Sequence, residues 1–372
     1  MVKTKIIRVP ADRQVASAAT LGAAALLNGQ LVAFATETVY GIAALAAHSG
    51  AIRRLRELKH RPSRPFTVHM GNPDELGKYV AKVPAAARRL IDRTWPGPVT
   101  LLLPTGGKLA DPKLNKAGLH KLLCSQGVIG LRCPDSPVAQ TMLSAVAQPV
   151  VAPSANPVGS PSARNGEEVL ATLNGKIDLL IDSGPTRYGK DSTIVRVDGG
   201  RWEVVREGVI DTATLAEIMK IQILFVCAGN TCRSPMAVGL AKAFLAQQLN
   251  CSTDKLEDRG WALASAGVAA TQSGAATPEA VHAAKVLGAD ISDHRSRPLT
   301  KELITQADMI FCMTDGQVDV VREMAPSAAD KVRRLDVSGP IADPIGAGPD
   351  IYRKVADRIR VAVRKKLKES LK

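Results

Sequence analysis

The segment that most constrains the fold of this chain is residues 227–233, Cys-Ala-Gly-Asn-Thr-Cys-Arg. It follows an apolar run at 221–226, and Ser234 and Pro235 come directly after it. Proline is favoured at the first position of a helix. Five residues between a cysteine and an arginine allow the backbone to curl until its N–H groups point at one anion. The segment therefore predicts a strand, a tight anion-binding loop and a helix in succession.

The residue types in this loop suit covalent chemistry at a phosphate. Inward-pointing amides and the positive end of a helix favour the thiolate of Cys227, which is the attacking form. Arg233 can bind two phosphate oxygens at once. Asn230 and Ser234 can hydrogen-bond within the loop and hold the thiolate, and Thr231 lies beside them. We therefore predict that Cys227 is a nucleophile.

Such a reaction also needs a general acid near the leaving group. Asp343 is the best candidate, because it lies in a loop rich in glycine and proline before the last expected helix. The same carboxylate can then activate the water that cleaves a phosphocysteine. Asp350 is the alternative, although it fits a helix cap better. For Cys232, a reversible disulfide with Cys227 and an inert filler are equally good interpretations.

In the N-terminal part, cationic, hydroxyl and amide side chains recur at the ends of expected strands and helices. They are Thr36, Lys59, Arg61, Arg64, His69, Arg132, Ser154, Asn156 and Ser192. Together they fit an anionic, nucleotide-like ligand without identifying a reaction. A basic cluster at 53–64 fits nucleic acid or nucleotide phosphates, and equally a solvated helix face. His69 taken alone fits a buried core histidine.

Length and composition limit the classes of protein. With 372 residues, two domains are expected. Aromatic residues make up 3%, which argues against a base-stacking RNA-recognition sheet, whereas the net charge of +14 suits anionic ligands. Six cysteines without a paired framework favour a reducing cytosol. We expect a cytoplasmic protein without a membrane span, because no segment reaches about 18 apolar residues.

Hydrophobic patterning predicts an α/β protein with a boundary near residue 220, giving domains at 1–219 and 220–372. In the first domain we expect helices at 13–28, 50–59, 84–94 and 211–219, and strands at 31–35, 99–103, 128–132, 149–152, 178–182, 193–197 and 202–206. In the second we expect strands at 221–226, 262–265, 308–313 and 332–335, and helices at 235–248, 278–288, 300–306 and 350–369. The alternation in the second domain predicts a small parallel sheet wrapped by helices.

Residues 10–210 resemble the YrdC-type threonylcarbamoyl-adenylate synthase family, through Lys59-x-Arg61 followed by Ser154-x-Asn156. The resemblance implies a mixed-sheet α/β domain that combines L-threonine, bicarbonate and ATP, with Mg²⁺, into threonylcarbamoyl-AMP and pyrophosphate. The product feeds a tRNA modification, so tRNA or tRNA-modification proteins are implied partners. No protein metal ligands are assigned. The alternative is a nucleotide- or RNA-binding module without catalysis.

The same resemblance distributes the residues between two ligands. It implies that Lys59, Arg61 and Arg64 hold ATP phosphates, and that Ser154 and Asn156 contact the nucleotide. It places Thr36, His69 and Ser192 beside threonine, with Arg132 lining the same cavity. Ala35 departs from the family, which usually has proline before this threonine, and the turn should be slightly looser.

Residues 221–370 resemble the low-molecular-weight protein-tyrosine phosphatase family, and its protein-arginine phosphatase branch most of all. Thr231 indicates the arginine phosphatase branch, because tyrosine-directed relatives usually have isoleucine or leucine at this position. Ile345 replaces the usual aromatic residue after Asp-Pro, which weakens the tyrosine interpretation. The resemblance implies a Rossmann-like domain that acts on phosphorylated proteins. Phosphoarginine and phosphotyrosine both remain open as substrates.

Overall fold

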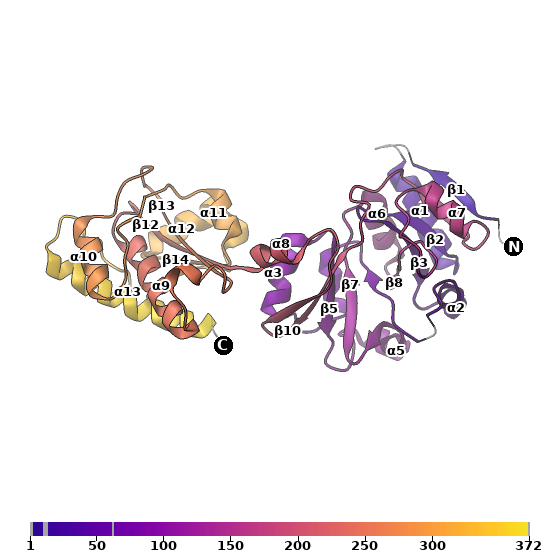
Figure 1. Cartoon of the computed structure of the whole chain (residues 1–372), viewed down its shortest axis with the longest axis horizontal. Coiled ribbons are helices and arrows are strands. Elements are labelled where there is room, and N and C mark those ends of the chain that lie inside the picture. Colours follow the sequence, from indigo (N-terminus) through magenta and orange to yellow (C-terminus); the bar gives the residue numbers. More distant parts are fainter. Residues whose placement is uncertain (1–2, 10–13, 62, 371–372) are drawn as a thin grey trace. The chain divides into compact units, whose positions relative to one another are not determined.

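The computed structural model describes residues 3–9, 14–61 and 63–370. The chain forms two compact units, Met1–Ile218 and Met219–Lys372, which are described separately as the N-terminal and C-terminal units (Figure 1). Residue 13, the first of an expected helix, lies outside the described residues. None of the described helices is both long enough and apolar enough to cross a membrane.

The N-terminal unit is built on a mixed sheet of eleven strands. The strands are β1 (Lys5–Arg8), β2 (Val32–Ala35), β3 (Tyr40–Leu45), β4 (Val68–His69), β5 (Val99–Pro104), β6 (Cys124–Ser125), β7 (Val128–Arg132), β8 (Val150–Val151), β9 (Leu179–Asp182), β10 (Thr193–Asp198) and β11 (Arg201–Arg206). Their order is β1-β9-β2-β3-β8-β4-β7-β5-β10-β11, with β6 paired to β7. The sheet contains parallel pairs such as β2–β9 and antiparallel pairs such as β5–β7.

The helices of this part are α1 (Val15–Leu27), α2 (Ser49–Leu58), α3 (Ala85–Thr94), α4 (Pro112–Lys116), α5 (Leu119–Leu123), α6 (Pro137–Val146), α7 (Gly166–Leu173) and α8 (Thr212–Met219). Helices α1 and α6 pack on each other and cover β2, β3 and β9 with small and aliphatic side chains. The two helices approach closely at Gly22 of α1, where an added Cβ atom would lie 2.6 Å from the sulfur of Met142 on α6. One hydrophobic core of the unit therefore lies beneath these two helices.

The C-terminal unit contains a four-stranded, wholly parallel sheet in the order β13-β12-β14-β15. Its elements are β12 (Ile221–Cys227), α9 (Arg233–Leu249), β13 (Trp261–Gly267), α10 (Pro278–Val286), α11 (Lys301–Gln306), β14 (Met309–Cys312), α12 (Asp315–Met324), β15 (Val332–Arg334) and α13 (Pro349–Ser370). The predicted α/β fold, a mixed-sheet domain followed by a domain with a parallel sheet, is confirmed.

Alternation along β12 explains why this sheet has a core on each face. Ile223, Phe225 and Cys227 belong to the core formed with α9, α10 and α13. Leu224 and Val226 belong to the core formed with α11 and α12. A central parallel strand is buried on both faces, which is why residues 223–226 of this strand are all apolar and buried.

Several elements were not predicted from the sequence. Strand β3 is buried along its whole length, and Gly41 and three alanine or leucine residues give it no alternating pattern. Helix α6 has a local signal, since Ser136 caps it and Pro137 follows. Helix α12 begins with a capping box between Thr314 and Gln317. Helix α9 starts at Arg233, two residues before the expected start.

Candidate active sites

The N-terminal unit contains a cavity of about 620 Å³ at the ends of several strands. Seven of the nine predicted site residues line it, namely Thr36, Lys59, Arg61, His69, Arg132, Ser154 and Ser192. Asn156 does not line it but contacts Lys59 and Ser154. Arg64 is exposed and is not among the lining residues. Side chains from positions as far apart as 36 and 192 thus converge on one space.

Lys59 links the end of α2 to the loop after β8. Its ammonium donates to the carbonyl oxygens of Ser154 and Asn156 at 2.9 and 2.7 Å, and to Oδ1 of Asn156 at 3.1 Å. These are as many acceptors as an ammonium has N–H groups. Burial, and then the charge of Arg61, lower the pKa of Lys59 to about 8, while Asp191 acts in the opposite direction. In the free protein Lys59 therefore holds the 154–156 loop in place.

Arg132 forms a buried ion pair that the sequence did not suggest. Its Nη2 lies 2.8 Å from Glu37 Oε1 and 2.7 Å from Thr38 Oγ1. Both charged side chains are at most 5% exposed. Among the described residues, its Nε has no hydrogen-bond partner although it is buried. An uncompensated buried donor costs free energy, so a polar ligand group at this position would stabilise the site.

Thr36 organises the turn that precedes β3. Its hydroxyl donates to the carbonyl of Val39 at 2.7 Å, and its oxygen accepts the N–H groups of Thr38 and Val39. The turn therefore closes around this hydroxyl even though Ala35, and not proline, precedes it.

His69 and Ser192 complete the polar wall. Burial, and then the charge of Arg132, lower the pKa of His69 to about 3, so its imidazole is neutral at physiological pH. Ser192 Oγ lies 2.9 Å from Thr100 Oγ1, and Arg206 donates to the Ser192 carbonyl at 2.7 Å. The wall offers neutral donors and acceptors on this side of the cavity.

Four charged residues of this cavity were missed by sequence reasoning. They are Asp191, Arg196, Asp198 and Arg206. Asp191 accepts from Ser162 Oγ at 2.8 Å and pairs with Arg206 at 3.4 Å. The strand predicted at 193–197 alternates apolar and polar residues, so its polar face was the available signal for Arg196.

In the C-terminal unit, the loop from Cys227 to Arg233 joins β12 to α9. The N–H of Asn230 donates to Cys227 Sγ at 3.2 Å, and Asn230 takes a positive φ of 54°. Asn230 Nδ2 donates to Ser234 Oγ at 2.8 Å, and that oxygen lies 2.9 Å from Sγ. Because Ser234 Oγ already accepts from Asn230, its own hydrogen is available to Cys227.

Opposing influences act on the Cys227 thiol. Burial raises its pKa, and this is the largest influence. Hydrogen bonds from Ser234 and from the Asn230 N–H, and the charge of Arg233, act against it. The loop supplies the groups expected to favour a thiolate, but burial outweighs them in the free protein.

Arg233 and Asp343 form an ion pair beside Cys227. The guanidinium is buried and also donates to the carbonyl of Ile341 at 3.1 Å. The carboxylate is 38% exposed, on the loop before α13. Asp350 lies in the first turn of α13 and pairs with Arg353 instead. Of the two candidate acids, Asp343 is therefore the one that the structure brings to the loop.

Thr231 and Cys232 precede Arg233 in the loop. Thr231 is half-buried, and its hydroxyl lies 3.7 Å from Cys232 Sγ. Cys232 is buried, with Sγ 3.5 Å from Thr277 Oγ1 and 3.4 Å from the Tyr352 hydroxyl. Both Cys227 and Cys232 are free thiols. The choice between a redox partner and a filler for Cys232 stays open.

Residues from 294–297 support the loop and were not predicted as site residues. His294 Nε2 lies 2.7 Å from the carbonyl oxygen of Asn230. The N–H of Arg297 donates to Asn230 Oδ1 at 2.9 Å. Both contacts fix Asn230, whose N–H points at the thiol. No local motif signals them, because they depend on a loop more than sixty residues away.

Comparison with known proteins assigns a family to each unit. Residues 24–208 match the Sua5–YciO–YrdC family model, described as "Telomere recombination". Residues 222–372 match the model described as "Low molecular weight phosphotyrosine protein phosphatase".

Individual relatives agree with these matches. The threonylcarbamoyl-AMP synthase of Bacillus subtilis is 37% identical over 185 residues, which are 50% of this chain and 50% of that protein. The putative threonylcarbamoyl-AMP synthase of Methanocaldococcus jannaschii is 33% identical, over 51% of this chain and 86% of the relative. The protein-arginine-phosphatase of B. subtilis is 35% identical, over 40% of this chain and 96% of the relative.

The chain belongs to both families, with a Sua5–YciO–YrdC domain followed by a low-molecular-weight phosphatase domain. It thus joins two enzyme families in one polypeptide. It spans about half the length of the B. subtilis synthase that it matches.

Proposed function

We propose that the N-terminal unit synthesises L-threonylcarbamoyl-AMP from L-threonine, bicarbonate and ATP. In that reaction the threonine nitrogen bonds to the bicarbonate carbon with loss of water, and the α-phosphorus of ATP then bonds to an oxygen of this carbamate and loses its bond to the pyrophosphate oxygen. The cavity must therefore hold a polyanion beside an amino acid. The observation that supports this best is the convergence of Lys59, Arg61 and Ser154 on one 620 Å³ space. Cations at one site suit phosphate oxygens.

The roles within the cavity follow from the chemistry of each wall. Arg61, with Arg64 from outside the cavity, binds the ATP phosphates, and Lys59 positions the loop that carries Ser154 and Asn156 against the nucleotide. Thr36, His69 and Ser192 bind threonine. A neutral His69 suits an amino acid better than a cationic one, because it does not repel the α-ammonium. Arg132, with its buried unpaired Nε, offers a donor to a carboxylate or to bicarbonate.

Mg²⁺ fits this site only together with ATP. No cluster of three or more His, Cys, Asp or Glu side chains able to hold a metal exists among the described residues. Magnesium is commonly held by one or two carboxylates and by substrate phosphates. Asp191 and Asp198, both on the cavity wall, are the carboxylates that could share it with the triphosphate. The bound ion would neutralise phosphate charge.

We further propose that the C-terminal unit dephosphorylates proteins by a two-step route. Cys227 Sγ attacks phosphorus while Arg233 and the loop N–H groups bind the phosphate oxygens. The bond from phosphorus to the leaving nitrogen or oxygen breaks, and Asp343 gives that atom a proton. Water then attacks the phosphocysteine, its proton goes to Asp343, and phosphate and the Cys227 sulfur separate. The placement of Asp343 beside Arg233 carries this proposal.

Phosphoarginine is the favoured substrate over phosphotyrosine. Ile345 is 66% exposed and lies two residues after Asp343. An aromatic residue would be needed at this position to stack on a tyrosine ring. Thr231 places a small polar group within the Cys227–Arg233 loop, and such a group suits a guanidinium substrate. The B. subtilis relative at 35% identity bears the name protein-arginine-phosphatase. Phosphotyrosine remains the second candidate, because the family model itself is named for it.

The location and partners belong to the same proposal. We place the protein in the cytoplasm, where its six free cysteines stay reduced. Its adenylate product would pass to tRNA-modifying proteins, and phosphorylated proteins would be substrates of the second unit. Direct RNA binding by the first unit would use its basic residues.

Each of the two proposed activities has its own assay. Pyrophosphate release from ATP by the purified chain should require both threonine and bicarbonate. Release that ignores threonine would contradict the synthase function. For the phosphatase, kcat/KM on phosphoarginine and phosphotyrosine peptides should favour phosphoarginine, and Thr231→Ile should remove the preference. A wild-type preference for phosphotyrosine would show that phosphotyrosine, the second candidate, is the substrate.

A further inference from the structure

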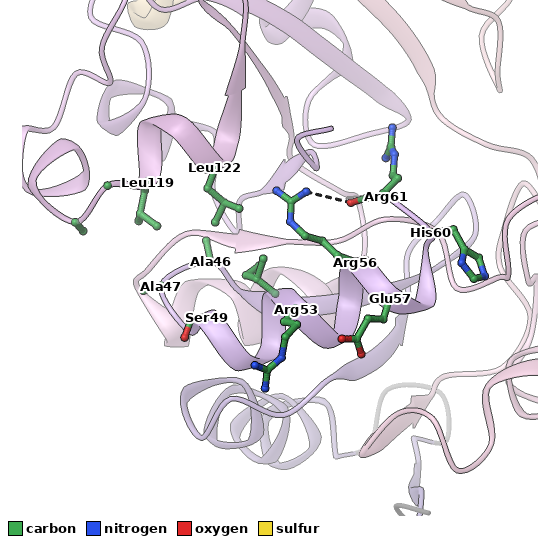
Figure 2. A pocket seen from close by; sticks show the side chains of 13 residues that line it. Ala46, Ala47, Ser49, Arg53, Arg56, Glu57, His60, Arg61, Leu119 and Leu122 are labelled. Atoms are coloured by element: carbon green, nitrogen blue, oxygen red, sulfur yellow. Dashed lines mark hydrogen bonds between the residues drawn. The ribbon is translucent and has the colours of Figure 1, made fainter. Parts of the chain in front are cut away.

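A second cavity lies in the N-terminal unit between α2 and α5, outside the proposed substrate site (Figure 2). Its volume is about 660 Å³, within the roughly 300–1,000 Å³ typical of small-ligand pockets. Its apolar lining includes Ala46, Ile52 of α2, and Leu119 and Leu122 of α5. The proposed synthase reaction does not use this space.

Cationic side chains line the same cavity beside its apolar wall. Arg53 is exposed on α2, and no described carboxylate forms an ion pair with it. Arg56 also lines the cavity, and Figure 2 shows its side chain reaching to the carbonyl of Arg61. The carboxylate of Glu57 is the acidic group on the same rim. Arginines therefore outnumber acids, and the rim attracts an anion.

The two cavities share a lining residue, which is Arg61. Arg56 Nη1 donates to the Arg61 carbonyl at 3.0 Å. The guanidinium groups of Arg56 and Arg61 lie 5.8 and 5.5 Å from the centre of the Phe66 ring, and Phe66 lines the substrate cavity. Arg56, Phe66 and Arg61 thus form a continuous contact between the two spaces.

We propose that the α2–α5 cavity is a second ligand site, for a small amphipathic carboxylate, and that its occupant weakens ATP binding through Arg61. This coupling rests on the proposed role of Arg61 at the ATP phosphates. The apolar body would lie against Leu119 and Leu122, with the carboxylate toward Arg53 and Arg56. An anion near Arg61 partly neutralises the charge that the phosphates would use.

The class of ligand follows from what the wall offers. A nucleobase needs polar groups that match its edge, whereas the inner wall here is aliphatic. A simple inorganic anion would not cover the aliphatic wall, which would stay in contact with water. An apolar group with one negative charge satisfies both the wall and the rim, as in most small-molecule sites.

The first test measures the site directly. Anilinonaphthalene sulfonate, a fluorescent amphipathic anion, is titrated into the full-length protein and then displaced with octanoate. Arg53→Glu and Leu122→Glu should each weaken displaceable binding by about tenfold, the effect of 1.4 kcal/mol. Arg88→Glu is the matched control, because Arg88 is exposed on α3 and lines neither cavity. Unchanged binding in both site variants would overturn the proposal.

The second test measures the coupling without relying on turnover. Saturating octanoate should raise the Kd of a fluorescent ATP analogue by at least about threefold in the wild type and should not do so in Arg53→Glu. An unchanged Kd in the wild type would overturn the coupling. Failure of ATP to bind at all would refute the synthase function instead, and the first test would still decide the site. If Arg53→Glu weakens binding of bulk tRNA but not of the dye, the rim serves nucleic acid and the proposal fails.

Discussion

At the residue scale, each site depends on a buried cation whose contacts within the protein precede any ligand. Lys59 donates to oxygens of Ser154 and Asn156, and Arg233 pairs with Asp343. Burying a charge is costly unless polar groups surround it, and both are surrounded. A phosphate ligand must therefore compete with these contacts or add to them, and this determines how both sites respond to pH and to substitution.

We predict that ATP binding takes up protons near pH 8. The pKa of Lys59 is lowered to about 8, so near that pH the free protein holds a mixture of charged and neutral lysine. A bound polyanion favours the charged form, so binding should draw in up to about half a proton at pH 8. Titration calorimetry in buffers of different ionisation enthalpy measures this uptake.

The same experiment contains its own controls. At pH 6 Lys59 is already charged, so the uptake due to it should vanish. It should also vanish in Lys59→Met at pH 8. Equal uptake at both pH values, or in the variant, would assign the proton to another group.

We predict opposite effects of Asp343→Asn on turnover and on phosphate binding. If Asp343 is the general acid that we propose, its loss should lower kcat on phosphoarginine by about 10²–10⁴-fold. The same change removes the carboxylate that pairs with Arg233, so the inhibition constant of inorganic phosphate should fall. Steady-state kinetics with product inhibition give both values. Asp350→Asn, at a position that pairs with Arg353 on α13, should leave kcat unchanged. If it abolishes turnover instead, the alternative acid is correct.

At the element scale, the loop from Cys227 to Arg233 depends on close packing against the end of β13. A Cβ atom on Gly267 would lie 2.3 Å from the Ala228 carbonyl oxygen and 2.9 Å from the Asn230 nitrogen. Both are backbone atoms of the loop, so neither can move without disturbing it. Glycine at this position is therefore a requirement of the loop.

We predict that Gly267→Ala lowers both stability and activity of the C-terminal unit. Overpacking of this kind costs about 1–3 kcal/mol, and displacement of the Asn230 N–H removes a donor to Cys227. Denaturant unfolding and phosphatase kcat/KM report the two effects. Gly316→Ala is the control, because an added Cβ there meets nothing within 4 Å. Wild-type activity in Gly267→Ala would show that the loop tolerates the shift.

The elements also show where prediction from sequence succeeded. The strand, loop and helix around Cys227 are contiguous in sequence, so local pattern was enough to predict them. Arg132 and Glu37 lie 95 positions apart, and their ion pair depends on how the sheet is assembled. The same holds for His294 and Asn230. Short strands such as β4, of two residues, exist because their neighbours pair with them, and no period of two can appear over that length.

At the scale of the whole molecule, the two sets of candidate site residues lie in two separate units. The N-terminal cavity is lined by residues between 36 and 206, and the Cys227 loop and Asp343, the proposed general acid, lie between residues 227 and 343. Each of the site residues named above belongs to the same unit as the rest of its set. The central claim is therefore that one chain carries two enzymatic activities, each of which can be removed without the other.

The most direct test compares both activities in the full chain and in two single variants, Cys227→Ser and Lys59→Met. The account predicts that Cys227→Ser loses phosphoarginine hydrolysis but keeps pyrophosphate release that depends on threonine and bicarbonate, and that Lys59→Met does the reverse. Phosphatase turnover that persists in Cys227→Ser, or a wild-type chain that lacks either activity, would contradict it.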